Sequence, residues 1–570
     1  MLFKAELCGE RLNKKRVTVV SLILLVALGI AALAMAHYGQ SASWKFFLAF
    51  YPLLIILFGV AFLRQSGLTM AFVGLLITIV LAVFQFGTSL EVALRASAYG
   101  FVKSFGVSIS VAATMLMIFV MKEAGALGTV SKVIKHQVVE DEVRALYIGI
   151  GFGSFLTSLG VVTPALFPPL LVAIGFSPLA SIAIAVLGYN ATTSFALLSV
   201  PITLPAQIGG LNPVEMAFKI SIFLPVVSVG FAFAVLWLTG GKPSMRKGAL
   251  PAAICGLVLA LACLGTVSLD YFTGVEYVPL KIVGVIAGFC AMLSLFIYQK
   301  MRPPAVAKQE SVDYPAMKEI FRAFSPWIML TILAAVASVP QISSWLSGVL
   351  GASENIAIFA NQKVDLDILT QIYTWIFVAV FLSLLTLRPT KKQVKNAFAT
   401  WLKRFLGPFL AYSLYFCIAF VMAYSAMEIV NGVLIASALY NELNMNVVLG
   451  STLATIFGTG YIFVAASLGL FGAIVGGSET SSNVLFLNIQ KTATSKIGLS
   501  DAGFMTVYGS HAVAGGIASA ITPAKINNAV VTIDEPHETE ALVMRKHLLI
   551  ALLLTVATGI LTGIFVNLGL

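Results

Sequence analysis

Apolar stretches of roughly 20 residues recur along the whole chain, and each is long enough to cross the hydrocarbon core of a membrane as a helix. Of the 570 residues, 59% are hydrophobic and only 10% are charged, so the parts outside the membrane should be loops. The pattern lacks the short alternating strands of a membrane β-barrel. The sequence therefore predicts an all-α polytopic membrane protein with about thirteen transmembrane helices.

The net charge of +11 arises from clusters of Lys and Arg that lie beside the apolar stretches. One cluster runs from Lys4 to Arg16, ahead of the first stretch, and others lie at 242–247, 300–308 and 388–395. In membrane proteins such clusters mark the cytoplasmic loops, so this pattern sets topology and does not indicate affinity for nucleic acid. We therefore expect a multi-pass protein of the plasma membrane whose N-terminus lies in the cytoplasm.

Two apolar regions, 145–175 and 463–497, are interrupted by polar residues and fit poorly as complete crossings. The first contains Thr157 and Ser158, and the second contains a block of hydroxyl and amide side chains within 476–491. Lipid cannot solvate such groups, so a polar break at membrane depth persists only where protein or a water-filled cavity satisfies it. In transporters such broken segments hold the substrate. We therefore expect two re-entrant hairpins.

The two interrupted regions follow one plan, which indicates an internal repeat. Thr157 lies 18 residues before Gly175, Thr480 lies 18 residues before Gly498, and a polar-rich span follows each region. If the hairpins enter from opposite sides, the halves are inverted and the hairpin tips meet near the middle of the membrane. We expect N-terminal scaffold helices in 1–100, the first repeat in 101–240, central scaffold helices and cytoplasmic loops in 241–400, the second repeat in 401–524, and a cytoplasmic loop with a C-terminal transmembrane helix in 525–570.

The second polar block resembles a signature of the L-lactate permease family, Gly-Ser-Asp-Thr-Ser-Ser-Asn. In this chain the block reads Gly477-Ser478-Glu479-Thr480-Ser481-Ser482-Asn483. Shorter matches lie at 122–127, 325–327 and 424–427, so the resemblance extends from about residue 100 to the C-terminus. The family's first hairpin contains a Glu that is missing here from 155–164.

The resemblance implies a secondary transporter of lactate and glycolate that is typically coupled to protons. It also implies an elevator-type carrier of the wider ion-transporter superfamily, and it makes a homodimer unsurprising. The missing Glu in the first hairpin leaves the exact substrate and the coupling open.

A small carboxylate is negative, and the N-terminus of a half-helix at each hairpin tip offers positive potential and free amide donors. Hydroxyl and amide side chains near the tips add donors for its oxygens. The candidate substrate-binding residues are Thr157, Ser158, Thr163, Asn190, Thr192, Ser478, Thr480, Ser481, Ser482 and Asn483. The alternative is that these groups only cap the broken helices.

Ionisable residues within membrane segments are costly to bury and indicate function. Glu479 and His511 are therefore candidates for carrying the coupling proton, with a fixed capping charge and a packed histidine as their respective alternatives.

The resemblance implies a proton-coupled symporter of L-lactate, glycolate and related 2-hydroxymonocarboxylates, with a sodium-coupled carrier of another small organic anion as the alternative. A polytopic membrane enzyme or a channel is a further alternative of another class. The chain contains no H-E-x-x-H, no phosphate-binding loop and no cysteine spacing typical of metal sites, so we expect no enzymatic activity, no metal and no cofactor besides the coupling ion. The expected partners are a small carboxylate and the lipid bilayer.

Overall fold

The structure is a computed structural model, and its description covers Gly29 and residues 42–61, 65–137, 140–160, 167–301, 314–350, 355–476, 478–522, 525, 526, 529, 530, 533, 535 and 537–570. Within this described part, ten helices are long and apolar enough to cross a membrane. The all-α polytopic class is therefore confirmed. Thr163 and nearly all of the first apolar stretch lie outside the described residues.

The N-terminal third begins with pairs of apolar helices. Ser66 and Ser89 cap two of them, because each hydroxyl accepts a hydrogen bond from a backbone amide of the first turn. The helices are α2 (Ala42–Ala61), α3 (Gly67–Phe84), α4 (Leu90–Lys103), α5 (Phe105–Glu123) and α6 (Ala126–Gln137). α4 and α5 meet at Ser104, which lies between them with no side-chain cap bond to α5.

The first interrupted region folds into short helical segments, because Gly, Pro and polar residues divide it. They are α7 (Asp141–Leu146), the π-helix η1 (Tyr147–Phe152), α8 (Gly153–Ser158) and α9 (Phe167–Ile174). A broken helix follows, made of α10 (Pro178–Leu187), the 3-10 segments η3 (Gly188–Phe195) and η4 (Leu197–Ser199), and α11 (Val200–Gly209).

The central part consists mostly of long apolar helices. They are α12 (Pro213–Ser221), α13 (Leu224–Lys247), α14 (Ala249–Thr273), α15 (Leu280–Lys300), α16 (Met317–Ala337), α17 (Pro340–Leu350) and α18 (Ile372–Leu387). The antiparallel strands β1 (Asn355–Phe359) and β2 (Gln362–Asp365) lie between α17 and α18.

The last third again contains a helix pair, α19 (Lys391–Arg404) and α20 (Leu406–Ala423), which runs antiparallel beside α4 and α5. The strands β3 (Met427–Val430) and β4 (Val433–Ala436) follow. The remaining elements are α21 (Tyr440–Leu443), α22 (Met445–Phe457), η6 (Gly458–Gly460), α23 (Tyr461–Gly476), α24 (Glu479–Lys496), α25 (Asp501–Ala518), η7 (Ser519–Ile521) and α27 (His537–Asn567).

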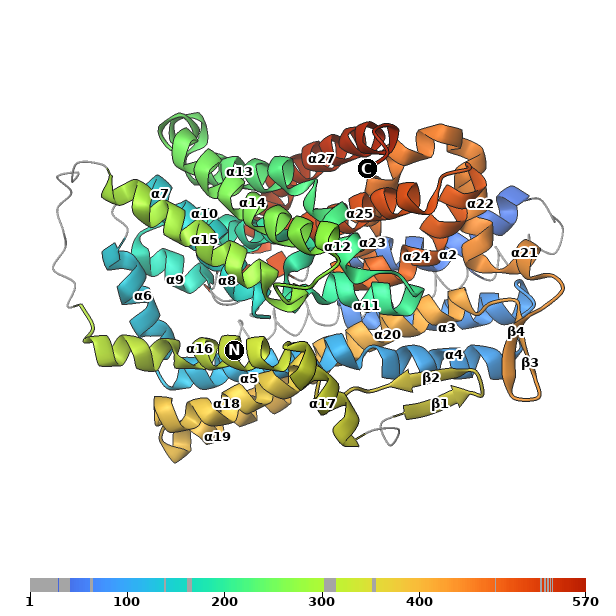
Figure 1. Cartoon of the computed structure of the whole chain (residues 1–570), viewed down its shortest axis with the longest axis horizontal. Coiled ribbons are helices and arrows are strands. Elements are labelled where there is room, and N and C mark those ends of the chain that lie inside the picture. The colour runs from blue at the N-terminus through green and yellow to red at the C-terminus, as the bar shows by residue number, and fades with distance from the viewer. Residues whose placement is uncertain are drawn as a thin grey trace, which may run out of the picture.

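The two β-hairpins were not predicted from the sequence, although a signal for the second exists. Asn431 and Gly432, between two short apolar runs, both have positive φ and form the tight turn that favours a two-residue hairpin loop. Asn361 of the first hairpin bonds the backbone of Leu434 in the second through both its donor and its acceptor. The two hairpins are thus joined at one end of the molecule (Figure 1).

The helices form an elongated body in Figure 1. α5, α16, α18 and α19 lie along one long edge, α13, α14 and α27 lie along the opposite edge, and α8, α11, α24 and α25 lie between them. The elements that carry most of the polar residues are thus covered from both edges.

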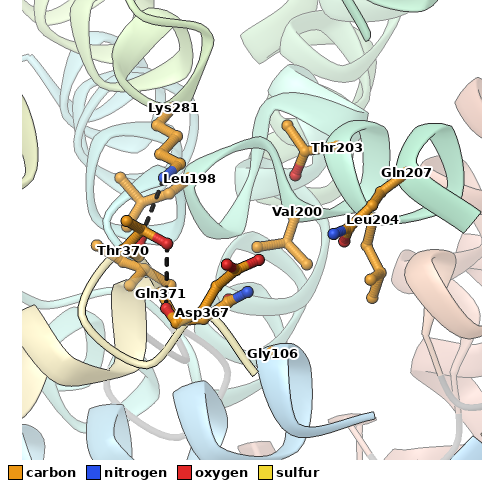
Figure 2. Close-up of a pocket in the computed structure, with 11 residues that line it drawn as sticks. Gly106, Leu198, Val200, Thr203, Leu204, Gln207, Lys281, Asp367, Thr370 and Gln371 are labelled. Carbon is orange, nitrogen blue, oxygen red and sulfur yellow. Dashed lines mark hydrogen bonds between the residues drawn. The ribbon is translucent and has the colours of Figure 1, made fainter. Parts of the chain in front are cut away.

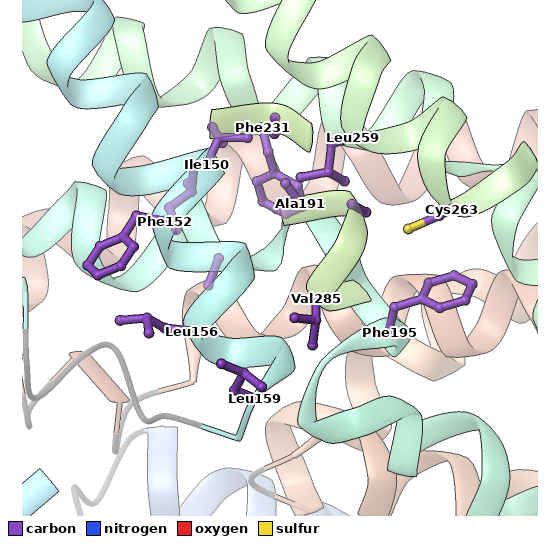
Figure 3. Packing of buried hydrophobic residues seen from close by; sticks show 14 of the residues in the cluster. Ile150, Phe152, Leu156, Leu159, Ala191, Phe195, Phe231, Leu259, Cys263 and Val285 are labelled. Atoms are coloured by element: carbon purple, nitrogen blue, oxygen red, sulfur yellow. The ribbon is translucent and has the colours of Figure 1, made fainter. Parts of the chain in front are cut away.

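Apolar packing fixes the first interrupted region within this body. Phe231 of α13, Leu259 of α14 and Val285 of α15 pack around η1, α8 and η3 (Figure 3). Gly149 of η1 lies against Gly188 of η3, where a Cβ on Gly188 would sit 2.6 Å from the Cα of Gly149. Small residues at such crossings let helix backbones approach closely in the membrane.

Candidate functional site

The second polar block forms the first turn of α24. Ser478 is its N-cap, with its Oγ 3.1 Å from the amide nitrogen of Ser481, which donates to it. Glu479 is the first helical residue and is only 6% exposed. A carboxyl group at this position faces the positive end of the helix dipole, which favours negative charge there. The sequence thus builds a buried acidic group at a helix N-terminus.

Glu479 also connects the two halves of the chain. Ser194 of η3 donates a hydrogen bond from its hydroxyl to the Glu479 carboxyl, across 285 positions of sequence. Gly516 of α25 completes the junction, since an added Cβ would lie 2.7 Å from Thr193 Cβ and 2.9 Å from Glu479 Oε2. Segments η3, α24 and α25 therefore meet at one buried carboxyl group.

The η3 side of this junction has an unusual backbone. Thr193 adopts φ 42° and ψ −119°, and the next turn contains Leu197, Leu198 and Ser199, all with φ between 51° and 59°. Positive φ is strained for a β-branched residue and persists only where the surroundings impose it. The Thr193 hydroxyl is buried and has no hydrogen-bond partner in the described structure. The broken helix thus presents a strained polar turn beside Glu479.

Asn483 fixes α24 against the start of α11. Its side-chain Nδ2 donates to the carbonyl of Pro201 at 2.9 Å. The residue four positions after Pro201 is Pro205, which has no N–H, so Asn483 supplies the donor that the helix lacks. Tyr508 of α25 donates its hydroxyl to the Asn483 carbonyl at 2.7 Å, while Asn483 Oδ1 is buried and unpaired within the described part of the chain.

His511 lies in a fully buried hydrogen-bond network. Gln490 accepts from the Tyr461 hydroxyl through Oε1, so its Nε2 donates to His511 Nδ1 at 3.0 Å. The other ring nitrogen, Nε2, lies 3.2 Å from Ser482 Oγ, whose own proton is donated to the Gly469 carbonyl. His511 Nε2 must therefore carry the proton and donate it, which defines a neutral imidazole with both nitrogens paired.

The first polar region differs in its hydrogen bonding. The hydroxyls of Ser154, Thr157 and Ser158 are buried, and none has a partner among the described residues. Ser158 Oγ lies against Gly284 of α15, close to the backbone carbonyl of Phe195 at the end of η3. The end of α8 thus lies next to the strained turn, and its hydroxyls bond to none of the residues that the structure describes.

The sequence of the whole chain identifies its relatives. The pattern that defines the family described as L-lactate permease matches residues 45–569. The chain belongs to the L-lactate permease family. It is 25% identical over 461 residues to the L-lactate permease of Streptococcus iniae, which covers 79% of this chain and 91% of the relative. It is also 25% identical over 518 residues to the glycolate permease GlcA of Escherichia coli strain K12. This alignment covers 82% of this chain and 86% of the relative.

A solved structure gives a weaker likeness. Neisseria gonorrhoeae MtrF, described as illuminating a class of antimetabolite efflux pumps, aligns with a TM-score of 0.41 and 13% identity. The alignment covers 88% of this chain and 96% of MtrF. A score this low supports no inference about this member of the L-lactate permease family.

Two predicted residues of this L-lactate permease family member donate hydrogen bonds within their own helical segment. Asn190 donates to the carbonyl of Val186 at 2.9 Å, and Thr192 donates to the carbonyl of Tyr189 at 3.4 Å, both within their own helical segment. Their neighbours Thr193 and Ser194, not proposed as site residues from the sequence, contact α25 and α24 instead. No local sequence signal predicts the contacts of Thr193 and Ser194.

The remaining predicted residues lie close to one another in α24. Ser478, Thr480, Ser481, Ser482 and Asn483 are all buried in its first turns. Ser478 and Ser481 also bond through their hydroxyls at 2.8 Å.

A basic residue, Lys525, follows η7 in the sequence. Lys525 donates to Ser519 Oγ at 2.9 Å and lies 5.6 Å from the centre of the Tyr189 ring. It attracts the Glu479 carboxylate electrostatically. No group of three His, Cys, Asp or Glu side chains suited to a metal ion occurs in the described part of the chain.

Proposed function

We propose that this chain is a secondary active transporter that carries L-lactate, glycolate and related small 2-hydroxymonocarboxylates together with protons across the plasma membrane. The observation that carries the proposal is the buried Glu479 carboxyl, which receives a hydrogen bond from Ser194 of the other half of the chain. The names of the relatives, L-lactate permease and glycolate permease, support the substrate class.

Protonation of Glu479 provides the coupling. An ionised Glu479 would repel a substrate carboxylate, and the repulsion between two like charges is much stronger in a buried site than in water. The protonated carboxyl is neutral and can donate a hydrogen bond, so a proton must arrive before or with the anion. Because His511 is neutral and paired at both ring nitrogens, we assign it a positioning role for α24 and leave the proton to Glu479.

Polar groups around Glu479 supply the substrate contacts. The N-terminus of α24 offers positive potential, and buried polar atoms of Thr193 and Asn483 are unpaired in the described structure. On the α8 side, Thr157 and Ser158 add two further unpaired hydroxyls. An unpaired buried polar group is costly, and a polar ligand that pairs with these groups would recover that cost.

The order of elements supports two inverted halves with re-entrant hairpins. In each half a divided helix pair is followed by a short helix, by the two helical limbs of the interrupted region and by a broken helix, with α7–α8 and α9 corresponding to α23 and α24. α6 and α9 lie towards one end of the long axis in Figure 1, and α22 lies towards the other. We therefore propose that the two hairpins enter from opposite sides, and that an elevator-like movement of their bundle exposes the site alternately.

Uptake by the purified protein in liposomes tests this function. Labelled L-lactate and glycolate are offered with acid outside, with and without a sodium gradient, and with a protonophore as the control. We expect accumulation that follows the pH gradient, ignores sodium and collapses with the protonophore. Uptake that depends only on the sodium gradient would show that Na+, not the proton, is the coupling ion. A folded protein that carries neither acid would refute the substrate assignment.

A further inference from the structure

A cavity of about 210 Å³ lies beside the strained turn, away from Glu479. It is lined by α11, by the start of α15 and by the segment that leads into α18. The lining residues include Leu198, Thr203, Gln207, Lys281, Asp367 and Gln371 (Figure 2). We refer to it as the Lys281 cavity. One water needs only ~10–15 Å³ of such space, so the cavity has room for a small organic acid.

Lys281 supplies positive charge to this cavity. Its half-buried ammonium donates one hydrogen bond, to the carbonyl of Thr370 at 3.2 Å (Figure 2). In the described part of the chain it forms no ion pair with a carboxylate. An ammonium has three donors, so Lys281 retains capacity for an anion.

The other polar groups favour an anion that also has a hydroxyl group. The amides of Gln207 and Gln371 can donate or accept, and the Thr203 hydroxyl, whose proton goes to the Ser199 carbonyl, can accept. Asp367 is only an acceptor when ionised, so it repels a simple carboxylate but accepts a hydrogen bond from a hydroxyl. A 2-hydroxycarboxylate satisfies both features, with its carboxylate on Lys281 and its hydroxyl on Asp367.

The cavity is linked directly to the strained turn. Leu198, with φ 53°, lines it, and Ser199 donates to the carbonyl of Leu280 at 2.7 Å, immediately before Lys281. On the other side, Asp367 follows β2 by two residues, so the cavity lies towards the β-hairpins. The same broken helix reaches Glu479 through Ser194.

We propose that the Lys281 cavity is a second binding site for small 2-hydroxycarboxylates, which the substrate occupies on its way between the β-hairpin side and the Glu479 junction. The ligand class rests on the proposed function, whereas the location of the site rests on the cavity itself.

Protection of an introduced thiol tests the site without any transport. Thr203 is half-buried in the cavity and donates only to the carbonyl of Ser199 in its own helix, so Thr203→Cys places a thiol there with little disturbance. Its labelling by a methanethiosulfonate reagent is timed in purified protein, with the parent chain labelled in parallel for its native cysteines. At ten times the dissociation constant, L-lactate should slow labelling by about tenfold, and acetate should slow it much less.

Substitutions of Lys281 test whether its ammonium group is responsible for the protection. Lys281→Met should abolish it and Lys281→Arg should retain it. Lys300→Met, at the other end of the same helix, is the matched control and should change nothing. The proposal would be overturned if L-lactate protected the thiol equally well with and without Lys281→Met. It would also be overturned if L-lactate gave no protection in the Thr203→Cys protein. If Lys281→Met does not fold, Gln207→Leu replaces it and should weaken protection.

Failure of this site and failure of the proposed function give different results. In the Thr203→Cys background, Glu479→Gln should keep the protection, because Glu479 does not line the Lys281 cavity. Lost protection in that protein would contradict two separate sites. Protection by L-lactate in a protein that shows no uptake would leave the cavity site standing and refute only the transport function.

Discussion

The two interrupted regions of this chain both contain buried hydroxyls at a helix end, but these hydroxyls differ in their hydrogen bonding. In the second, Ser478 caps α24, Ser482 pairs with His511 and Asn483 completes the helix broken by Pro205. In the first, the hydroxyls of Thr157 and Ser158 are equally buried and have no partner among the described residues. The second region therefore organises the junction between the halves, whereas the first has unpaired hydroxyls, which we propose contact the substrate.

The largest effect is expected where the two halves touch. A Cβ at Gly516 would collide with Thr193 and Glu479, so Gly516→Ala should separate η3 from α24. Overpacking of this kind costs about 1–3 kcal/mol, and uptake should fall by up to about 100-fold. Gly265→Ala in α14 is the control, since nothing lies within 4 Å of its Cβ position, and it should keep normal uptake. Normal uptake by both proteins would show that the close contact is not needed.

Removal of one paired hydroxyl, Ser482, and one unpaired hydroxyl, Ser158, tests the difference between the two regions. Ser482→Ala leaves the His511 donor buried and unpaired, which should lower the free energy of unfolding by about 1–3 kcal/mol. Ser158→Ala removes a buried hydroxyl that has no partner among the described residues, so the free energy of unfolding should not fall. Its KM for L-lactate should instead rise about two- to tenfold. Thermal unfolding and uptake kinetics of the two variants measure both quantities, and an unchanged KM for Ser158→Ala would remove the first region from the site.

Much of the fold follows from the sequence, because apolar length and polar interruptions are local signals. The polar interruption within 463–497 is found where the sequence predicts it, between α23 and α24 and in the first turn of α24. The contact of Ser194 with Glu479 is not predictable in this way, since it depends on how two halves 285 positions apart align. Asn190 and Thr192, which the sequence predicts as site residues, donate hydrogen bonds within their own helical segment, and whether they also contact substrate stays a prediction.

The smallest effect concerns the strained backbone itself. Thr193→Gly should relieve a conformation that costs about 1–3 kcal/mol, and the greater freedom of glycine in the unfolded chain offsets about 0.4–1 kcal/mol of this gain. We therefore expect a net stabilisation of about 1 kcal/mol, seen as a higher melting temperature. Thr192→Gly, one residue earlier and without positive φ, should instead lower it. Equal changes in both variants would contradict the assignment of strain to Thr193.

The central claim is that the buried Glu479 carboxyl couples a proton to the movement of a small carboxylate. Glu479→Gln keeps the size of the side chain and stays permanently neutral, as the protonated acid would be. In liposomes, this variant should exchange internal for external labelled lactate but should not accumulate lactate in response to a pH gradient, while Glu442→Gln on exposed α21 should do both. Accumulation driven by the pH gradient in the Glu479→Gln protein would contradict the account.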